Sequence, residues 1–329
     1  MKKAQILMKH PIYRFLGRYI PQPLAPLVLR ATETFRKRTR KKTLPTNDQK
    51  EAVIKQHGKF SVAELGTFLS DWGISTGDLL MVQSSLDNMF TYRGTAMQTV
   101  SILKELVGIN GTLMMPASPL MTSAKDNVFD IKKTPTDAGI ISEVFRRAPG
   151  VVRSYQQRAV SAFGHEKDYL VSEHHLSPYA CGTRSPYAKL ARKNGKILCM
   201  GVEPTTNTMF HCGEDILKDR FPVNVYFKKP SLFRVRCEKG FIKDIPYYNR
   251  KFRWDLCCDS SRMLQYFDES IIQHKRLKGV DFYLTFADSF LDRILTLANN
   301  GVHMYGLRFP DKEKIPTLSA KDPMNNSKY

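Results

Sequence analysis

A histidine and a glutamate stand three residues apart in the segment Asn207-Thr208-Met209-Phe210-His211-Cys212-Gly213-Glu214. If this segment begins a helix, His211 and Glu214 share a face, because residues three apart are neighbours on a helix surface. A carboxylate beside an imidazole fixes the tautomer of the ring and raises its pKa, as a general base requires. The spacing alone also fits a surface His–Glu pair near a helix N-terminus, so both interpretations stay open.

The elements around this segment indicate where it lies. The apolar run 196–202 follows an Asn194-Gly195 turn and is typical of a buried strand. Two further buried strands, 79–82 and 112–115, flank a helix over 95–106, and this βαβ order implies a parallel sheet. Ligands of α/β sheets bind beyond the carboxyl ends of the strands, which is where 207–214 falls.

The remaining patterns complete a single α/β domain over residues 46–310. Ser61 and Glu64 form a capping-box pattern before a helix that runs to Leu69. Further predicted elements are helices over 139–147, 185–192 and 289–298, a strand over 282–286, a strand-rich region over 220–245 and a long polar loop over 117–136. We therefore predict a three-layer αβα fold around a mostly parallel, mixed central sheet.

The charge is concentrated at the N-terminus. The chain has 329 residues and a net charge of +20, and residues 1–42 hold twelve Lys or Arg and one acidic residue. Residues 1–45 read as a basic amphipathic extension that lies on an anionic membrane surface or packs on the domain before a solvated linker. Residues 311–329 read as a flexible tail.

The composition disfavours several classes of protein. No apolar run of about 18 residues predicts a transmembrane helix, and no secretory signal is evident. The six cysteines form no Cys-x-x-Cys pair, which indicates reduced thiols and no metal site. We expect a cytoplasmic protein that can contact the inner face of the membrane through residues 1–45. Nucleic-acid binding is disfavoured, because no stripe of the body alternates Lys or Arg with aromatic residues.

Four motifs in register resemble the aminoglycoside 3-N-acetyltransferase family. Asn207-Thr208-x-x-His211-x-x-Glu214 follows a strand that ends in Gly201-Val202 and looks like the family signature. The other three motifs are 82–86 (Val-Gln-Ser-Ser-Leu), 111–116 (Gly-Thr-Leu-Met-Met-Pro) and 182–190 (Gly-x-x-Ser-Pro-x-x-x-Leu). The resemblance covers roughly residues 50–305.

The resemblance implies acetyl transfer from acetyl-CoA, with no metal, to an amine that is commonly carried by an amino sugar. It implies that His211 or Glu214 is the base and the other residue orients it. Thr208 or His211 would give a proton to the departing thiolate. Ser84, Ser85 and Thr208 are the candidate donors to the oxyanion. Contacts with acetyl-CoA are assigned to Ser84, Ser85, Gln83, Asn207 and Arg184, of which Arg184 suits the CoA phosphates.

Two departures from the family pattern bear on the acceptor. Gln83 stands where the family usually has His, and Gln156-Gln157 stands where it usually has His-Pro. An amide carries no proton charge near neutral pH, so the acceptor pocket is expected to differ. An aminoglycoside remains one candidate, but a less cationic amino sugar, nucleotide- or lipid-linked in polysaccharide assembly, is favoured. The alternatives are a family member without catalysis and a basic protein that binds nucleic acid or membrane surfaces.

Overall fold

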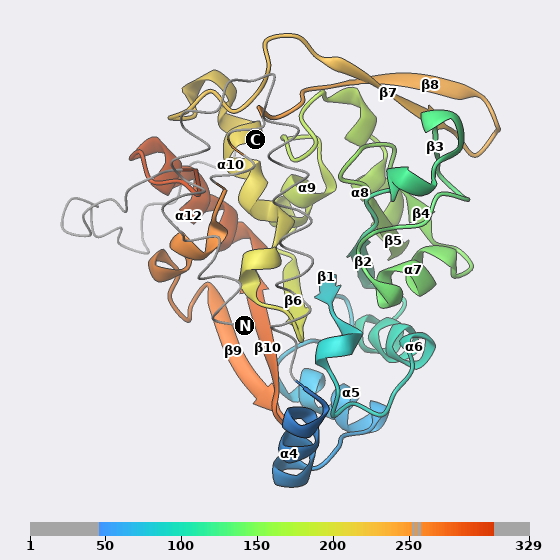
Figure 1. Cartoon of the computed structure of the whole chain (residues 1–329), viewed down its shortest axis with the longest axis vertical. Coiled ribbons are helices and arrows are strands. Elements are labelled where there is room, and N and C mark those ends of the chain that lie inside the picture. The colour runs from blue at the N-terminus through green and yellow to red at the C-terminus, as the bar shows by residue number, and fades with distance from the viewer. Residues whose placement is uncertain (1–45, 252–253, 255–257, 306–329) are drawn as a thin grey trace.

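The computed structural model describes residues 46–251, 254 and 258–305. A seven-stranded sheet with the order β4-β5-β2-β1-β6-β10-β9 forms its centre (Figure 1). Its strands are β1 (Leu79–Ser84), β2 (Thr112–Pro116), β4 (Val152–Arg153), β5 (Val160–Gly164), β6 (Lys196–Met200), β9 (Ile272–Leu277) and β10 (Val280–Phe286). A second sheet has the order β3-β7-β8, from β3 (Phe129–Asp130), β7 (Ser231–Arg236) and β8 (Ile242–Tyr247).

The strand directions confirm a mixed α/β sheet but correct the expected parallel majority. Within the seven-stranded sheet, β1 pairs in parallel with β2 on one side and β6 on the other, whereas the outer pairs are antiparallel. The β9–β10 pair is a hairpin, and its turn residues Lys278 and Gly279 both have positive φ. Such a two-residue turn joins antiparallel strands and cannot join parallel ones.

Helices pack against both faces of the sheet. They are α4 (Asn47–His57), α5 (Val62–Asp71), α6 (Ala96–Val107), α7 (Ile140–Arg147), α8 (Lys167–Val171), α9 (Pro186–Arg192), α10 (Cys212–Leu217) and α12 (Ala287–Asn299). Alternate residues of β1 enter two separate cores, because successive side chains of a strand point to opposite faces. Leu80 and Val82 pack with side chains of α5, α6 and α7, and Met81 packs with those of α9, α10 and α12.

Most predicted elements are present with shifted ends. The Ser61 hydroxyl accepts from the Glu64 amide at 3.2 Å, and the Glu64 carboxylate accepts from the Ser61 amide at 2.7 Å, which confirms the capping box. The sequence interpretation missed α4, β3, β4, β5, α8 and β9, most of which are short, exposed or at the edge of a sheet. The predicted extension 1–45 and tail 311–329 lie outside the described residues.

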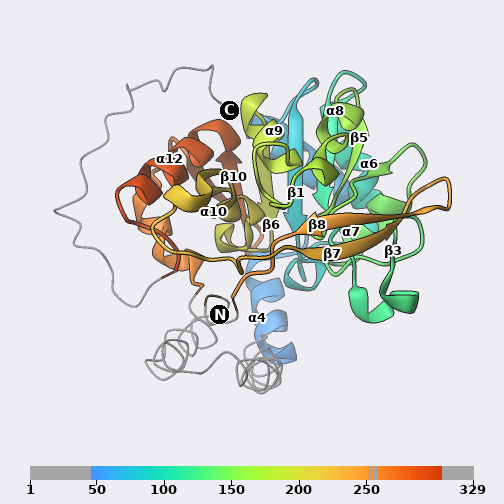
Figure 2. The ribbon, with the colours of Figure 1, turned by 90° about the horizontal axis from the view of Figure 1, so that it is seen from above.

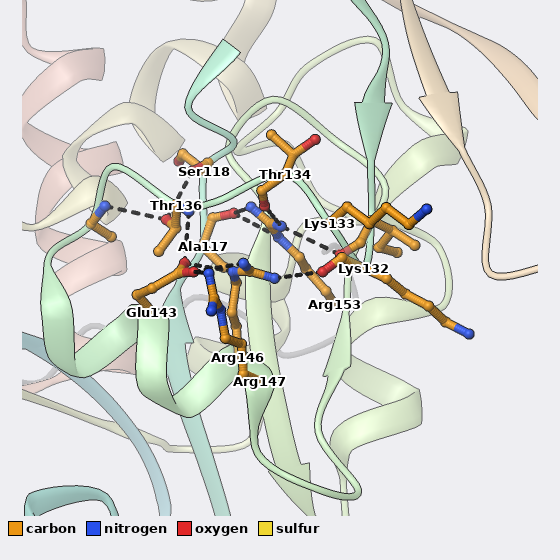
Figure 3. Close-up of polar contacts among 12 residues, drawn as sticks. Ala117, Ser118, Lys132, Lys133, Thr134, Thr136, Glu143, Arg146, Arg147 and Arg153 are labelled. Carbon is orange, nitrogen blue, oxygen red and sulfur yellow. Dashed lines mark hydrogen bonds and ion pairs between the residues drawn. The ribbon is translucent and has the colours of Figure 1, made fainter. Parts of the chain in front are cut away.

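The polar loop 117–136 is held in place by a buried arginine. Arg153 donates to the carbonyls of Ala117 at 2.9 and 2.5 Å and of Thr134 at 2.6 Å, as Figure 3 shows. Its guanidinium also lies 4.6 Å from the centre of the Phe129 ring. Burial lowers the pKa of Arg153 to about 9, so the side chain still carries its charge at neutral pH.

A second arginine ties the same loop to α7. Arg146 donates to both carboxylate oxygens of Glu143 at 2.6 Å and to the Lys132 carbonyl at 2.8 Å. Glu143 in turn accepts from the Thr136 amide at 2.9 Å (Figure 3). The segment is therefore held largely by contacts to its main chain, and it also contains the short strand β3, which the prediction of a loop did not include.

Over the described part of the chain, no helix combines the length and the hydropathy that crossing a bilayer takes. Among the same residues, no group of three or more His, Cys, Asp or Glu side chains is placed to hold a metal ion.

Replacing Arg153 with Met should destabilise the fold by roughly 3 kcal/mol, because buried carbonyls of the 117–136 loop lose their donor. Urea unfolding measures the free energy, and amide hydrogen exchange over 117–136 should accelerate. The matched control is Arg147→Ala, since the Arg147 side chain is 64% exposed and should change stability by less than about 0.5 kcal/mol. Equal stability of Arg153→Met and wild type would contradict this role of Arg153.

Candidate active site

The His211–Glu214 segment is set against the sheet by its aromatic and small residues. After β6, the chain forms two short 3-10 turns, Pro204–Thr206 and Thr208–His211, before α10 begins at Cys212. Phe210 packs against Phe290 of α12, with ring centres 4.9 Å apart. A Cβ on Gly213 would lie 2.9 Å from Ile294, so glycine permits the close approach of α10 to α12.

His211 and Glu214 form a direct pair. Nδ1 of His211 lies 2.7 Å from Oε1 of Glu214, within hydrogen-bond distance. The Glu214 side chain is 1% exposed, whereas that of His211 is 16% exposed. The carboxylate therefore lies behind the imidazole, and the ring separates it from solvent.

Two residues from distant segments complete the contacts of Glu214. Tyr305 donates its hydroxyl to Oε1 of Glu214 at 2.6 Å and accepts from Nη1 of Arg250 at 3.1 Å. Nη1 of Arg250 also lies 3.0 Å from Nδ1 of His211. A ring nitrogen has one in-plane site, so the Nδ1 that pairs with Glu214 cannot also accept from Arg250. Arg250 thus acts as a charge beside the ring and as a donor to Tyr305.

The environment shifts the pKa values of the pair in opposite directions. Burial, reinforced by the negative charge of Asp215, raises the pKa of Glu214 to about 8. Burial and the charges of Arg158 and Arg250 hold the pKa of His211 well below its usual value. Below a pH of about 8, which is the pKa of Glu214, the pair holds one more proton, and His211 and Glu214 share it across the Nδ1–Oε1 contact. Above that pH, Nε2 of the neutral ring keeps a free lone pair. The geometry suits a general base that works at mildly alkaline pH.

Asp215 is a second buried carboxylate, and its hydrogen-bond partners give it a structural role. Its Oδ2 accepts from the Cys181 amide at 2.6 Å, and its Oδ1 accepts from the Tyr226 hydroxyl. Tyr226 packs with Tyr179 and Tyr248, at ring centre distances of 5.5 and 6.2 Å. Asp215 therefore anchors an aromatic cluster of Tyr179, Tyr226 and Tyr248 beside the His–Glu pair.

Gln83 lies on β1, next to the last residue of the strand, and Asn207 follows β6 and its first 3-10 turn. Gln83 Oε1 accepts from the Thr206 hydroxyl at 3.2 Å, and Asn207 Oδ1 accepts from the Met209 amide at 3.0 Å. Both side chains are buried, and their NH₂ groups have no hydrogen-bond partner among the described residues. They supply two donors that the described part of the fold does not use.

The other expected site residues have contacts of their own. Thr208 lies on the His211 turn and hydrogen-bonds to the buried Tyr187 hydroxyl. Ser84 is the half-buried last residue of β1, while the Ser85 amide donates to the Met200 carbonyl at 3.0 Å. Arg184 is exposed in the turn before α9, and its charge acts on Glu173. Among the described residues, no hydrogen bond or ion pair joins Ser84, Ser85 or Arg184 to His211 or Glu214.

Tyr305, Arg250 and Asp215 were not singled out from the sequence. Tyr305 lies 91 positions from Glu214 and comes after α12, and Arg250 follows the β7–β8 hairpin. In Figures 1 and 2 this hairpin crosses one end of the molecule and brings the chain back toward α10. Of these three residues, only Asp215 could have been found from its local sequence, because it directly follows Glu214 of the motif.

The surroundings of Gln156 and Cys212 indicate structural roles for both residues. Gln156 is fully buried, donates to the Ser177 carbonyl at 3.1 Å and accepts from the Gln157 amide at 2.8 Å. Both the NH₂ group and the oxygen of the Gln156 amide are thus engaged in hydrogen bonds within the protein. Burial raises the pKa of the Cys212 thiol well above its usual value, which is unsuited to a nucleophile.

Solved structures share this fold. Aminoglycoside acetyltransferase AAC(3)-Xa aligns with a TM-score of 0.65 at 17% identity over 79% of this chain and 99% of its own. AAC-IIIb, solved as a binary complex with CoASH, aligns with a TM-score of 0.61 at 19% identity over 75% of this chain and 99% of its own. At these identities the likeness establishes the fold alone.

Sequence relatives place the chain in a family. Aminoglycoside N(3)-acetyltransferase IV of Salmonella sp is 30% identical over 159 residues, 47% of this chain and 59% of the relative. The aminoglycoside N(3')-acetyltransferase-like protein YokD of Bacillus subtilis is 27% identical over 164 residues, 43% of this chain and 60% of the relative. The chain thus spans about 60% of the length of these curated relatives. The family model for aminoglycoside 3-N-acetyltransferase matches residues 81–294, and the chain belongs to this family.

Proposed function

We propose that the protein is an acetyl-CoA-dependent N-acetyltransferase that acts on the amino group of an amino sugar. The proposal rests on one observation, the series of hydrogen bonds that runs from Arg250 through Tyr305 to Glu214 and His211. Family membership and the likeness to a CoASH complex support the same donor. Two finer predictions from the sequence are part of this proposal: the reaction is cytoplasmic, and the acceptor is an amino sugar of polysaccharide assembly.

The reaction requires a base on the side of the incoming amine. As the amine nitrogen forms a bond to the thioester carbon, one of its protons passes to Nε2 of His211. Glu214 accepts the Nδ1 proton in its hydrogen bond and stabilises the imidazolium, as a buried carboxylate does beside a catalytic histidine. Collapse of the intermediate breaks the carbon–sulfur bond, and His211 or Thr208 returns a proton to the thiolate of CoA.

The oxyanion of the intermediate needs donors that are already oriented. The unpartnered NH₂ groups of Gln83 and Asn207 are suited to this role, since their oxygens are held by Thr206 and the Met209 amide. Ser84 at the end of β1 adds a hydroxyl. Gln83 therefore substitutes for the family histidine as a donor and loses the ability to carry a proton.

His211→Ala and Glu214→Gln should each lower kcat by roughly 10²–10⁴-fold, because the proton acceptor or its charged partner is lost. Thiol release from acetyl-CoA is measured with a panel of free, nucleotide-linked and lipid-linked amino sugars and an aminoglycoside. KM for acetyl-CoA should change little. The control is His274→Ala on the sheet edge, whose side chain is 50% exposed and whose loss should leave kcat within about twofold.

Turnover that survives His211→Ala with most of its kcat would exclude the base assignment. Wild-type protein that binds CoA but acetylates no amine of the panel would instead support the family member without catalysis.

The pH dependence of kcat should follow the loss of the proton that His211 and Glu214 share. kcat should rise with pH and level off above about 8, the pKa of Glu214, as the base loses its extra proton. Tyr305 lowers that pKa through its hydrogen bond, so Tyr305→Phe should move the rise to higher pH by about one unit. The variant then loses activity at pH 7 and keeps most of it at pH 9.5.

The comparison uses the same saturating amine for both enzymes, so ionisation of the amine cancels. Tyr247→Phe on β8 is the control and should leave the profile in place. A Tyr305→Phe profile that drops equally at every pH would mean that Tyr305 only supports the fold.

A further inference from the structure

The β7–β8 hairpin has two faces of different character. Phe233 and Val235 of β7 and Ile245 of β8 are at most 5% exposed and pack in a small core with Phe129. The residues that alternate with them lie on the outer face, since successive side chains of a strand point to opposite sides. An antiparallel sheet with one buried face usually presents polar residues on the other.

The outer face and the turn of this hairpin instead expose large apolar side chains. In the register of the pair, Leu232 lies opposite Pro246, and Ile242 lies opposite Arg236. The exposed fraction is 64% for Leu232, 39% for Ile242 and 51% for Phe241 in the turn. Three of the eight large hydrophobic residues that are exposed in the described part of the chain thus belong to one hairpin.

Basic side chains surround these apolar residues. Residues 228–246 hold six Lys or Arg and two acidic residues. Arg234 pairs with Asp244 at 3.9 Å, and Arg236 pairs with Asp130 at 3.6 Å. The other four basic side chains are exposed, and none of them has an ion pair with a described residue. They are Lys228, Lys229, Lys239 and Lys243.

The hairpin is placed where it can meet a flat partner. Figures 1 and 2 show that it runs across one end of the molecule and that its turn extends past β3. The Lys243 ammonium lies 5.6 Å from the centre of the Phe241 ring, so positive charge and apolar surface are adjacent near the turn. The outer face, the turn and the lysines are therefore available together.

The hairpin is poorly suited to pairing with another protein strand. β8 is the edge of the β3-β7-β8 sheet, and it carries Lys243 and Pro246. Lysine and proline are residues that block strand addition at a sheet edge. A second copy of the chain, related by a two-fold axis, would bring the lysines of two hairpins together. The surface that offers both negative charge and an apolar layer is the headgroup region of an anionic bilayer.

We propose that the outer face and turn of the β7–β8 hairpin dock on the surface of an anionic lipid bilayer, with Leu232, Phe241 and Ile242 at the headgroup level. Apolar side chains that enter the interface and basic residues that attract anionic lipids both contribute to such binding. The chain carries a second basic segment, because residues 1–42 hold twelve Lys or Arg and one acidic residue. Stable attachment commonly takes two signals of this kind. Docking does not require that the protein catalyse acetyl transfer.

Co-sedimentation of the full chain with lipid vesicles measures this docking. At about 0.1 M salt, vesicles of equal parts phosphatidylglycerol and phosphatidylcholine should bind wild type roughly tenfold or more tightly than vesicles of phosphatidylcholine alone. The triple change Leu232→Ser, Phe241→Ser and Ile242→Ser should weaken binding roughly 10–100-fold. Lys239→Gln combined with Lys243→Gln should weaken it roughly tenfold. The matched control is Ile109→Ser after α6, a 90% exposed apolar residue outside the hairpin, which should bind as wild type does.

Two results would overturn the inference in this assay. If both hairpin variants bind anionic vesicles as tightly as wild type, the contact belongs to residues 1–45 and not to the hairpin. If wild type binds neither vesicle, the hairpin has no lipid partner. Ultracentrifugation without lipid covers the remaining partner, because a dimer that Leu232→Ser dissociates would identify the face as a contact between copies.

A tryptophan probe tests the same contact without removing any apolar residue, so it does not depend on the folding of the triple variant. Phe241→Trp should show a blue-shifted emission with anionic vesicles and should be quenched by brominated lipids. Ile109→Trp is the control and should show neither change. An emission of Phe241→Trp that stays unchanged on vesicles to which the protein binds would contradict docking through the hairpin.

Discussion

The hydrogen bond between His211 and the buried carboxylate of Glu214 is the contact on which the site depends. A carboxylate out of water is stable only when it is protonated or held by donors, and Glu214 has both options. Tyr305 and Arg250 favour its charged form, whereas burial and Asp215 favour its protonated form. This balance brings the pKa of Glu214 to about 8, so a small change in either contact alters how strongly His211 accepts a proton.

The fold serves this contact by joining segments that are distant in the chain. β6 and its turns present His211, α10 packs closely on α12 through Gly213, and the chain after α12 returns with Tyr305. The β7–β8 hairpin returns with Arg250 (Figure 2). Arg153 holds the loop that precedes α7 in place through main-chain carbonyls. The His–Glu pair and its direct partners thus come from three segments, of which the family motif is one.

Local patterns in the sequence predicted local features well. The capping box at Ser61, the buried strands β1, β2 and β6, and the closeness of His211 to Glu214 depend on residues a few positions apart. The antiparallel outer strands were not predicted, because strand direction is set by tertiary pairing. Tyr305 and Arg250 were missed as site residues for the same reason: each reaches the pair from a distant segment, and nothing in its local sequence marks it.

If His211 and Glu214 share one proton, that proton leaves near the raised pKa of Glu214, at about 8. NMR of ring-¹⁵N-labelled histidine can follow His211 directly, with His211→Gln to assign its signals. We expect one transition near pH 8 that reports loss of the shared proton, with Nδ1 still hydrogen-bonded above it, and loss of that transition in Glu214→Gln. A His211 ring that titrates near pH 6.5 in both proteins would show that the two residues share no proton.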